Sequence, residues 1–166
     1  MMYLKYFWQL IRHKWFVFLS ACKLGIPWLG FIHDWSKFRP SEFIPYARFF
    51  YGNYPEFVGA HLPGYGGPTK FSAKRAFYVA WNHHQKRNKH HWQYWMLTND
   101  SDEPQTVCLA MPDKYRREML ADWHGAGRAY GNPDTAGWYD EHERRMHMHG
   151  DTRQWIVSQL AREDDI

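Results

Sequence analysis

The sequence predicts an all-α protein: a single compact bundle of five to seven helices with one long Gly/Pro-rich loop. Apolar residues recur at helical spacing in several segments, whereas no segment of useful length alternates apolar and polar residues as a strand does. No internal repeat is present. The length of 166 residues fits one domain covering residues 1–166.

Composition argues for a folded core rather than a disordered chain. Hydrophobic residues make up 45% and aromatic residues 19% of the sequence. The net charge of +4 permits phosphate-bearing partners without requiring nucleic acid. Cys22 and Cys108 are the only cysteines and lie far apart, which argues against a disulfide framework or a thiolate zinc site and favours a cytoplasmic protein. The 11 histidines point toward metal chemistry, because histidine is the commonest metal ligand.

The N-terminal segment superficially resembles a secretion signal, since basic residues precede an apolar run that begins at Trp15. Lys5, Arg12 and Lys14 interrupt the segment, and the uninterrupted apolar stretch is short. No stretch elsewhere has the length and hydrophobicity of a transmembrane helix. We therefore expect neither a signal peptide nor a membrane partner.

The first half of the chain predicts three helices. Residues 3–24 lack proline and glycine, and an apolar stripe predicts one amphipathic helix that ends at Gly25 and Pro27. The stripe consists of Tyr6, Leu10, His13, Val17, Ala21 and Leu24. A short helical segment over residues 27–34 and a turn over 36–40 follow, and Pro40 opens a helix that reaches about Tyr51.

The second half begins with the predicted loop, residues 52–68, which is rich in glycine and proline. Helical spacing then runs through Phe71, Phe77, Trp81, His84 and Asn88. After a polar connection over residues 98–105, Pro112 starts a helix with Tyr115, Met119, Asp122 and Ala126 on one face. Residues 131–137 break that pattern, and residues 152–160 form a last short helix.

Three residues with metal-ligand side chains occupy positions where apolar residues belong: His13, His84 and Asp122. Burying an unpaired imidazole or carboxylate is costly, so these groups need a shared partner. Together with the adjacent pair His33-Asp34 they offer the nitrogen and oxygen ligands of a divalent cation. Each histidine taken alone is also compatible with a hydrogen-bonded core position.

An ordered string of motifs resembles a family of bacterial and phage proteins of unknown function, over most of the chain. The motifs are Arg12-His13-Lys14-Trp15, Ile32-His33-Asp34-Trp35-Ser36-Lys37-Phe38, Ala80-Trp81-Asn82-His83-His84, Asn88-Lys89-His90-His91-Trp92, Met111-Pro112 and Glu118-Met119-Leu120-Ala121-Asp122-Trp123. More broadly, a histidine, an adjacent His-Asp pair and a distant aspartate resemble the HD-domain superfamily of metal-dependent phosphohydrolases. This resemblance implies an HD-like helical domain.

The HD resemblance implies that His13, His33, Asp34 and Asp122 are the basic ligand set. Two-metal members of the superfamily add histidines between the His-Asp pair and the last aspartate, which extends the set to His84, His90 and His91. His83 and His90 are seven residues apart, and so are His84 and His91, and either pair lies on one helix face two turns apart if the helix persists. Spacing alone therefore leaves both pairs open as ligands. The alternative interpretation of this stretch is a solvated basic helix face.

The implied chemistry needs one or two divalent ions, for which Mn, Fe, Co, Ni and Zn are all suitable. Such an ion lowers the pKa of a bound water and polarises a phosphoryl oxygen, which makes hydroxide available for in-line attack. Asp34 and Lys37 are the predicted catalytic residues, and Lys37 and Arg87 the predicted contacts to the substrate phosphate. Glu118 is either a carboxylate that orients a ligand histidine or an ordinary surface residue.

We expect a phosphohydrolase that acts on a nucleotide or another small phosphoester. Two alternatives stay open: a catalytically inert metal-binding or nucleotide-sensing module, and a nucleic-acid-binding accessory protein that uses Lys86, Arg87 and Lys89. The remaining histidines carry no such pattern and are expected to be structural or surface residues: His61, His124, His142, His147 and His149.

Overall fold

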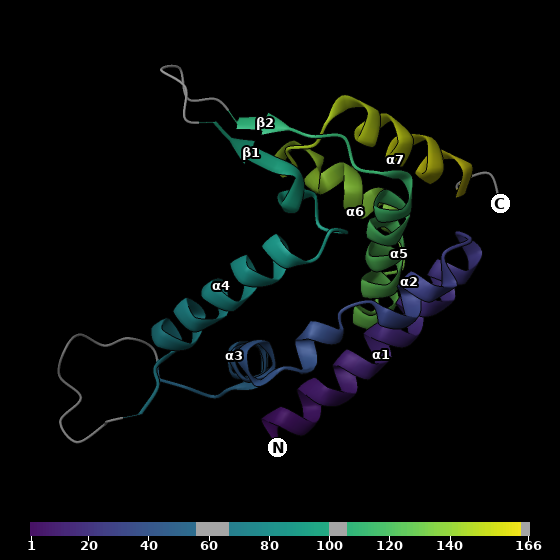
Figure 1. The fold of residues 1–166 in the computed structure, drawn as a ribbon. Helices are drawn as coiled ribbons and strands as arrows, with labels where there is room; N and C mark the ends of the chain where they lie inside the picture. The colour runs from purple at the N-terminus through teal and green to yellow at the C-terminus, as the bar shows by residue number, and fades with distance from the viewer. Residues whose placement is uncertain (56–66, 100–105, 164–166) are drawn as a thin grey trace. The chain divides into compact units, whose positions relative to one another are not determined.

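The computed structural model describes residues 1–55, 67–99 and 106–163, and this part of the chain is predominantly helical (Figure 1). Its helices are α1 Met2–Lys23, α2 Pro27–Ile32, α3 Pro40–Tyr51, α4 Lys70–Arg87, α5 Asp113–Tyr130, α6 Thr135–His142 and α7 Gly150–Glu163. Two short strands, β1 Met96–Thr98 and β2 Thr106–Cys108, and 3-10 turns over Trp35–Phe38, Trp92–Trp95 and Glu143–Arg145 complete it. The all-α prediction is confirmed. None of the helices within the described ranges is long and apolar enough to cross a bilayer.

Helix ends match the prediction where proline or glycine marks them. Pro40 is the first residue of α3, where its missing N–H costs nothing, and Gly25 follows α1 with φ of +75°. The predicted stripe of α1 is buried from Tyr6 to Ala21. Of the predicted loop, residues 56–66, which include His61, lie outside the described residues.

Two local predictions were wrong. The chain forms an antiparallel β1–β2 hairpin, which pairs Leu97 with Val107, because strands of three residues are too short to show an alternating pattern. Helix α6 begins at Thr135 inside the predicted break, because the Asp134 side chain accepts a hydrogen bond from the Gly137 N–H at 2.8 Å and caps the helix. Helix α4 ends at Arg87, one residue before the predicted limit at Asn88, and His90 and His91 lie beyond its end as expected.

The described chain divides into two compact units. The first unit comprises Met1–Ile11 and Asp34–His84, and the second comprises Arg12–His33 and Gln85–Ile166. The expectation of a single domain therefore stays a prediction.

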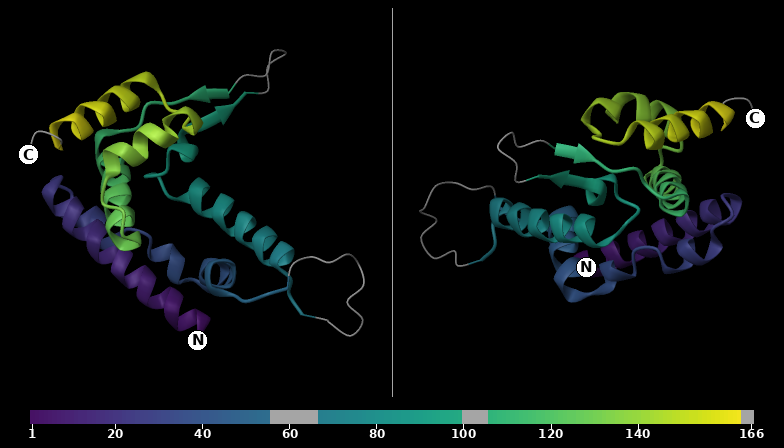
Figure 2. Two further views of the ribbon diagram at one scale, coloured as in Figure 1. Left: turned by 180° about the vertical axis from the view of Figure 1, so that it is seen from behind. Right: turned by 45° about the horizontal axis from the view of Figure 1, so that its top comes forward.

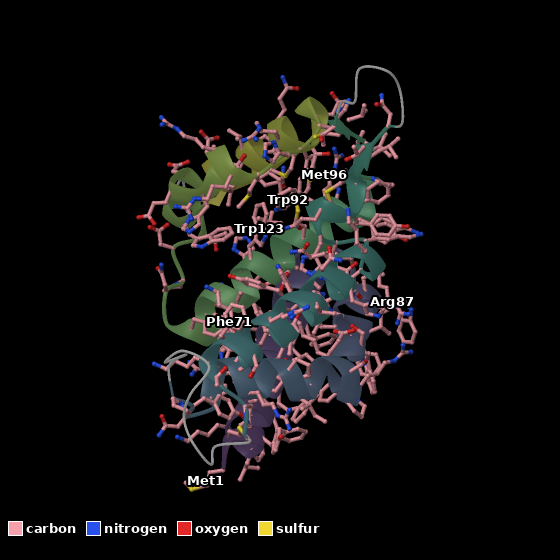
Figure 3. All side chains as sticks on the ribbon, turned by 90° about the vertical axis from the view of Figure 1, so that its left-hand side faces the viewer. Met1, Phe71, Arg87, Trp92, Met96 and Trp123 are labelled. Atoms are coloured by element: carbon pink, nitrogen blue, oxygen red, sulfur yellow. The ribbon has the colours of Figure 1, made fainter. Side chains whose placement is uncertain are left out.

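The second unit has its core between α5, α6 and α7, which lie together in Figures 1 and 2. Met119 and Leu120 of α5, Tyr139 of α6 and Ile156 of α7 are fully buried there. Trp92 and Trp123 pack against this core from its edge, among the side chains drawn in Figure 3. The result is a rigid setting for α5, the helix that carries Glu118 and Asp122.

The first unit is held by aromatic packing around α3 and α4. Tyr6 and Tyr46 are buried in its core, and Phe77 of α4 stacks on Phe49 of α3 with ring centroids 4.2 Å apart. The ring of Trp81 stacks on the ring of His84 at 5.7 Å. This packing fixes the face of α4 on which His84 lies.

Candidate metal centre

Helices α1 and α5 approach closely, and this approach sets the distance between His13 and Asp122. Gly125 makes it possible, because a Cβ added there would lie 2.6 Å from the backbone N of Val17. His13 lies one turn before Val17, and Asp122 lies one turn before Gly125. The Nε2 atom of His13 is 3.2 Å from Oδ1 of Asp122.

His33 joins this pair from the end of α2. The helix ends before it, because His33 adopts an extended conformation with ψ of 132°, and Lys14 donates a hydrogen bond to its carbonyl oxygen. The two ring nitrogens of His33 face two carboxylates of α5. Nδ1 lies 3.2 Å from Oε1 of Glu118, and Nε2 lies 3.3 Å from Oδ1 of Asp122.

His90 reaches the same carboxylates from the turn after α4. Its Nδ1 atom is 3.2 Å from Oε1 of Glu118, and its Nε2 atom is 4.0 Å from Oδ2 of Asp122. The rings of His33 and His90 lie 4.3 Å apart. His91 is also buried, with its ring 4.2 Å from that of His90.

The donor atoms of this cluster fit a divalent ion. Because an ionised carboxylate only accepts hydrogen bonds, Glu118 requires the proton of His33 and His90 on Nδ1. A neutral ring then presents the lone pair of Nε2 to the Asp122 carboxylate, which is repulsive unless a proton or a metal ion lies between them. Two ligands of one ion, each about 2.1 Å from it, lie about 3.0–3.4 Å apart, and the Nε2–Oδ1 distances of 3.2 and 3.3 Å match this spacing.

Electrostatics in the second unit favour ionised carboxylates. Burial raises the pKa of Asp122, but the charge of His33 and the hydrogen bond from His13 outweigh it, and the pKa lies well below its ordinary value. Burial likewise raises the pKa of Glu118, and hydrogen bonds from His33 and His90 bring the net pKa below its usual value. The lowered pKa values of Glu118 and Asp122 therefore favour their ionised forms, which attract a cation.

The first unit repeats the same arrangement around His84. Its Nδ1 atom lies 2.7 Å from Oε2 of Glu42, and its Nε2 atom lies 3.1 Å from Oδ1 of Asp34. The Ser36 hydroxyl donates to the same Glu42 oxygen at 3.1 Å. His33 has the same arrangement, with Glu118 on Nδ1 and Asp122 on Nε2. A carboxylate on Nδ1 commonly orients a histidine that binds metal through Nε2.

Asp34 is held in an uncommon backbone conformation. Its φ of +55° is left-handed, the only such value of a non-glycine residue in the described part of the chain. The Lys37 ammonium forms an ion pair with its other carboxylate oxygen, Oδ2. A conformation of this kind persists only when its surroundings require it, and such residues cluster at functional sites.

The pKa values in the first unit follow from these contacts. Burial raises the pKa of Glu42, but its hydrogen bond and charge interaction with His84 lower it below the usual value overall. Burial alone lowers the pKa of His84, whereas the neighbouring Asp34 carboxylate raises it, and the net shift is upward. The two neighbouring carboxylates therefore favour the protonated form of His84 in the metal-free protein.

The structure separates one pair of alternatives that spacing left open. His84 is fully buried, whereas His83 is exposed. His90 and His91 are both buried, so burial does not divide them. Arg87 is exposed in the last turn of α4 (Figure 3), and its contact with a substrate phosphate stays a prediction.

Two site residues were missed in the sequence, and the role of one was left open. Glu42 was missed because a carboxylate in the first turn of a helix is ordinary. Ser36 was noted only as part of a motif. Glu118, for which two interpretations were open, is buried and contacts two histidines, which agrees with the orienting carboxylate rather than a surface residue.

Fold and site together define a helical protein with a buried histidine and carboxylate cluster able to hold a metal ion. The chain belongs to a family of unknown function, DUF5662, whose model matches residues 2–162. Neither the curated proteins nor the solved structures yield a match.

We predict that the metal-free protein loses stability in acid. Because the pKa values of Glu42, Glu118 and Asp122 are lowered by folding, their contribution is present above the ordinary carboxyl values of 4.5 and 3.8 and is lost as the pH falls through the folded values. Urea unfolding in chelator at a series of pH values from neutral to acid measures this. The Glu118→Gln variant should show a weaker dependence, and a flat profile of the wild type contradicts the prediction.

Proposed function

We propose that the protein is a metal-dependent phosphohydrolase resembling the HD superfamily, with a nucleotide or another small phosphoester as its substrate. The observation that carries the proposal is the convergence of His13, His33 and His90, through their buried Nε2 atoms, on the carboxylate of Asp122. Imidazole and carboxylate donors together suit the divalent ions used in metal-assisted hydrolysis.

We propose metal-binding residues in each of the two units. His13, His33, His90 and Asp122 form the cluster of the second unit, and Asp34, His84 and His91 are added because the HD resemblance implies them. His33 and Asp34 are consecutive in the chain.

A divalent ion bound by these residues supplies a lowered pKa for a water molecule and a positive charge for a phosphoryl oxygen. Glu118 accepts hydrogen bonds from Nδ1 of His33 and His90, and Glu42 accepts one from Nδ1 of His84, so that the Nε2 atoms of these three rings are available as ligands. Lys37 neutralises Asp34 in the metal-free protein. The Lys37 ammonium is the first proposed contact to the phosphate of the substrate, and Arg87 is the second.

A catalytically inert metal-binding module is the second candidate. The observation in its favour is the number of protein donors, because a site filled entirely by side chains leaves no position for water. In that case the ion contributes to folding rather than to a reaction.

Elemental analysis of the purified protein, combined with hydrolysis assays on a panel of nucleotides and phosphodiesters, tests the proposal. We expect one or two bound ions, loss of hydrolysis when a chelator removes them, and recovery when Mn²⁺, Fe²⁺, Co²⁺, Ni²⁺ or Zn²⁺ is returned. Bound metal without hydrolysis of any member of the panel favours the inert module. Absence of metal after reconstitution overturns both.

A further inference from the structure

Helix α1 exposes a continuous stripe of large apolar side chains. On a helix with 3.6 residues per turn, Leu4, Trp8, Ile11 and Trp15 share one face, and all four are exposed, Trp8 to 61% and Trp15 to 58%. The opposite face carries the buried residues of the helix. We call these four residues the aromatic face.

A second exposed apolar surface adjoins this helix. Helix α2 lies alongside the C-terminal half of α1 in Figures 1 and 2, where Gly30 allows an approach in which an added Cβ would lie 2.4 Å from Cβ of Ala21. The rings of Trp28 and Phe31 stack on each other at 5.7 Å and are both exposed. Two neighbouring helices thus present indole and phenyl rings to solvent, an arrangement that single scattered apolar residues do not produce.

The charge around the aromatic face has one sign. Residues 1–33 contain four lysines and arginines and no aspartate or glutamate. Three of the cations, Lys5, Arg12 and Lys23, are exposed and share one edge of α1 beside the aromatic face. The fourth, Lys14, donates hydrogen bonds to the backbone carbonyls of Phe31 and His33.

This combination identifies the chemistry of the partner. Tryptophan prefers the boundary between headgroups and acyl chains, and lysine and arginine beside an apolar face extend toward anionic headgroups. A second copy of the chain brings the same cations and is repelled, which argues against self-association through this face. Leu4 and Ile11 cannot stack on bases, which argues against a nucleic acid.

We propose that the aromatic face docks on the surface of an anionic lipid bilayer, with α1 lying in the plane of the interface. The expectation of no membrane partner rested on the lack of a signal peptide and of spanning segments, and binding at the surface requires neither. The proposal is independent of the phosphohydrolase activity.

Flotation of the full-length protein with vesicles tests the proposal, using phosphatidylcholine alone and phosphatidylcholine mixed with phosphatidylserine. We expect the wild type to float with the mixed vesicles and much less with the neutral ones. The variant Trp8→Gln/Trp15→Gln should bind the mixed vesicles at least about tenfold more weakly. Its matched control, Phe71→Gln/Tyr130→Gln, removes two exposed rings elsewhere and should float like the wild type.

The electrostatic part has its own variant. Lys5→Gln/Lys23→Gln should weaken binding to mixed vesicles by about fivefold for each lysine, whereas Lys70→Gln/Lys114→Gln, with the same change in net charge, should not. The proposal is overturned if the wild type does not float, if it floats equally with both vesicles, or if the tryptophan variant floats unchanged. A dimer or an RNA complex that the tryptophan variant disrupts, without flotation of the wild type, also overturns it.

Discussion

In the proposed metallohydrolase, Asp122→Asn should empty the candidate metal centre and lower phosphoester hydrolysis by about a thousandfold or more. The substitution keeps the shape of the side chain but removes the negative charge that His13, His33 and His90 surround. A catalytic metal ion contributes several kcal/mol to the transition state, and about 4 kcal/mol corresponds to about a thousandfold in rate. Elemental analysis and the nucleotide assay on the same preparation measure both effects.

Two further variants make this result specific. Asp151→Asn alters an exposed aspartate at the start of α7 and should leave metal content and turnover unchanged. Glu118→Gln alters a carboxylate that orients the histidines rather than binding the ion, so metal affinity should fall by about 10–100-fold. Full metal occupancy and turnover in Asp122→Asn would contradict the assignment of this carboxylate as a ligand.

Helix bounds were predictable wherever a single residue type decides the backbone. Pro40 fixes the start of α3, and the glycine at residue 25 follows the end of α1. Helix α6 escaped prediction because its start depends on one side-chain hydrogen bond, from the Gly137 N–H to Asp134, within a segment whose proline and glycines indicate a loop. The pattern of apolar residues indicates which face of a helix is buried, but it does not indicate a side-chain hydrogen bond that caps the helix.

Residues of the candidate site were likewise predictable where they lie within a helical apolar pattern and not where they lie outside one. His13 and Asp122 stood out because each interrupts an apolar stripe, and the structure places them 3.2 Å apart. Periodicity could not decide whether His90 or His91 is the ligand, because α4 ends at Arg87 and the turn after it follows no helical spacing. Glu42 gave no signal at all, since its partner His84 is 42 residues away in the chain.

His33 and His84 each lie between two carboxylates, and this pairing explains how the buried charges are accommodated without a large electrostatic penalty. His33 bridges Glu118 and Asp122, and the raised pKa of His84 reflects its place between Glu42 and Asp34. In the metal-free state the raised pKa of His84 favours a proton on its imidazole, which compensates the carboxylates of Glu42 and Asp34. A metal ion that binds must displace that proton, so metal binding is expected to release protons and to weaken as the pH falls.

Gly125→Ala should destabilise the protein by about 3 kcal/mol, the upper end of the usual cost of overpacking. The added methyl group would lie 2.4 Å from Cγ2, 2.6 Å from N and 2.8 Å from Cα of Val17. Two of these three atoms belong to the backbone of α1, so rotation of the Val17 side chain cannot relieve the overlap, and α5 must move away from α1. Urea unfolding of the variant beside the wild type measures the cost.

The same displacement should reach the metal centre. His13 lies one turn from Val17 on α1 and Asp122 one turn from Gly125 on α5, so separating the two helices lengthens the 3.2 Å distance between their side chains and weakens metal binding. Gly150→Ala is the control, because no atom lies within 4 Å of an added Cβ there, and its stability should change by less than about 1 kcal/mol. The combination Gly125→Ala/Val17→Ala removes the overlap with Cγ2 and keeps the two backbone overlaps, so it should not restore stability or metal affinity. Restoration by that double variant would show that side-chain packing, rather than the backbone approach of α1 and α5, sets the geometry of the centre.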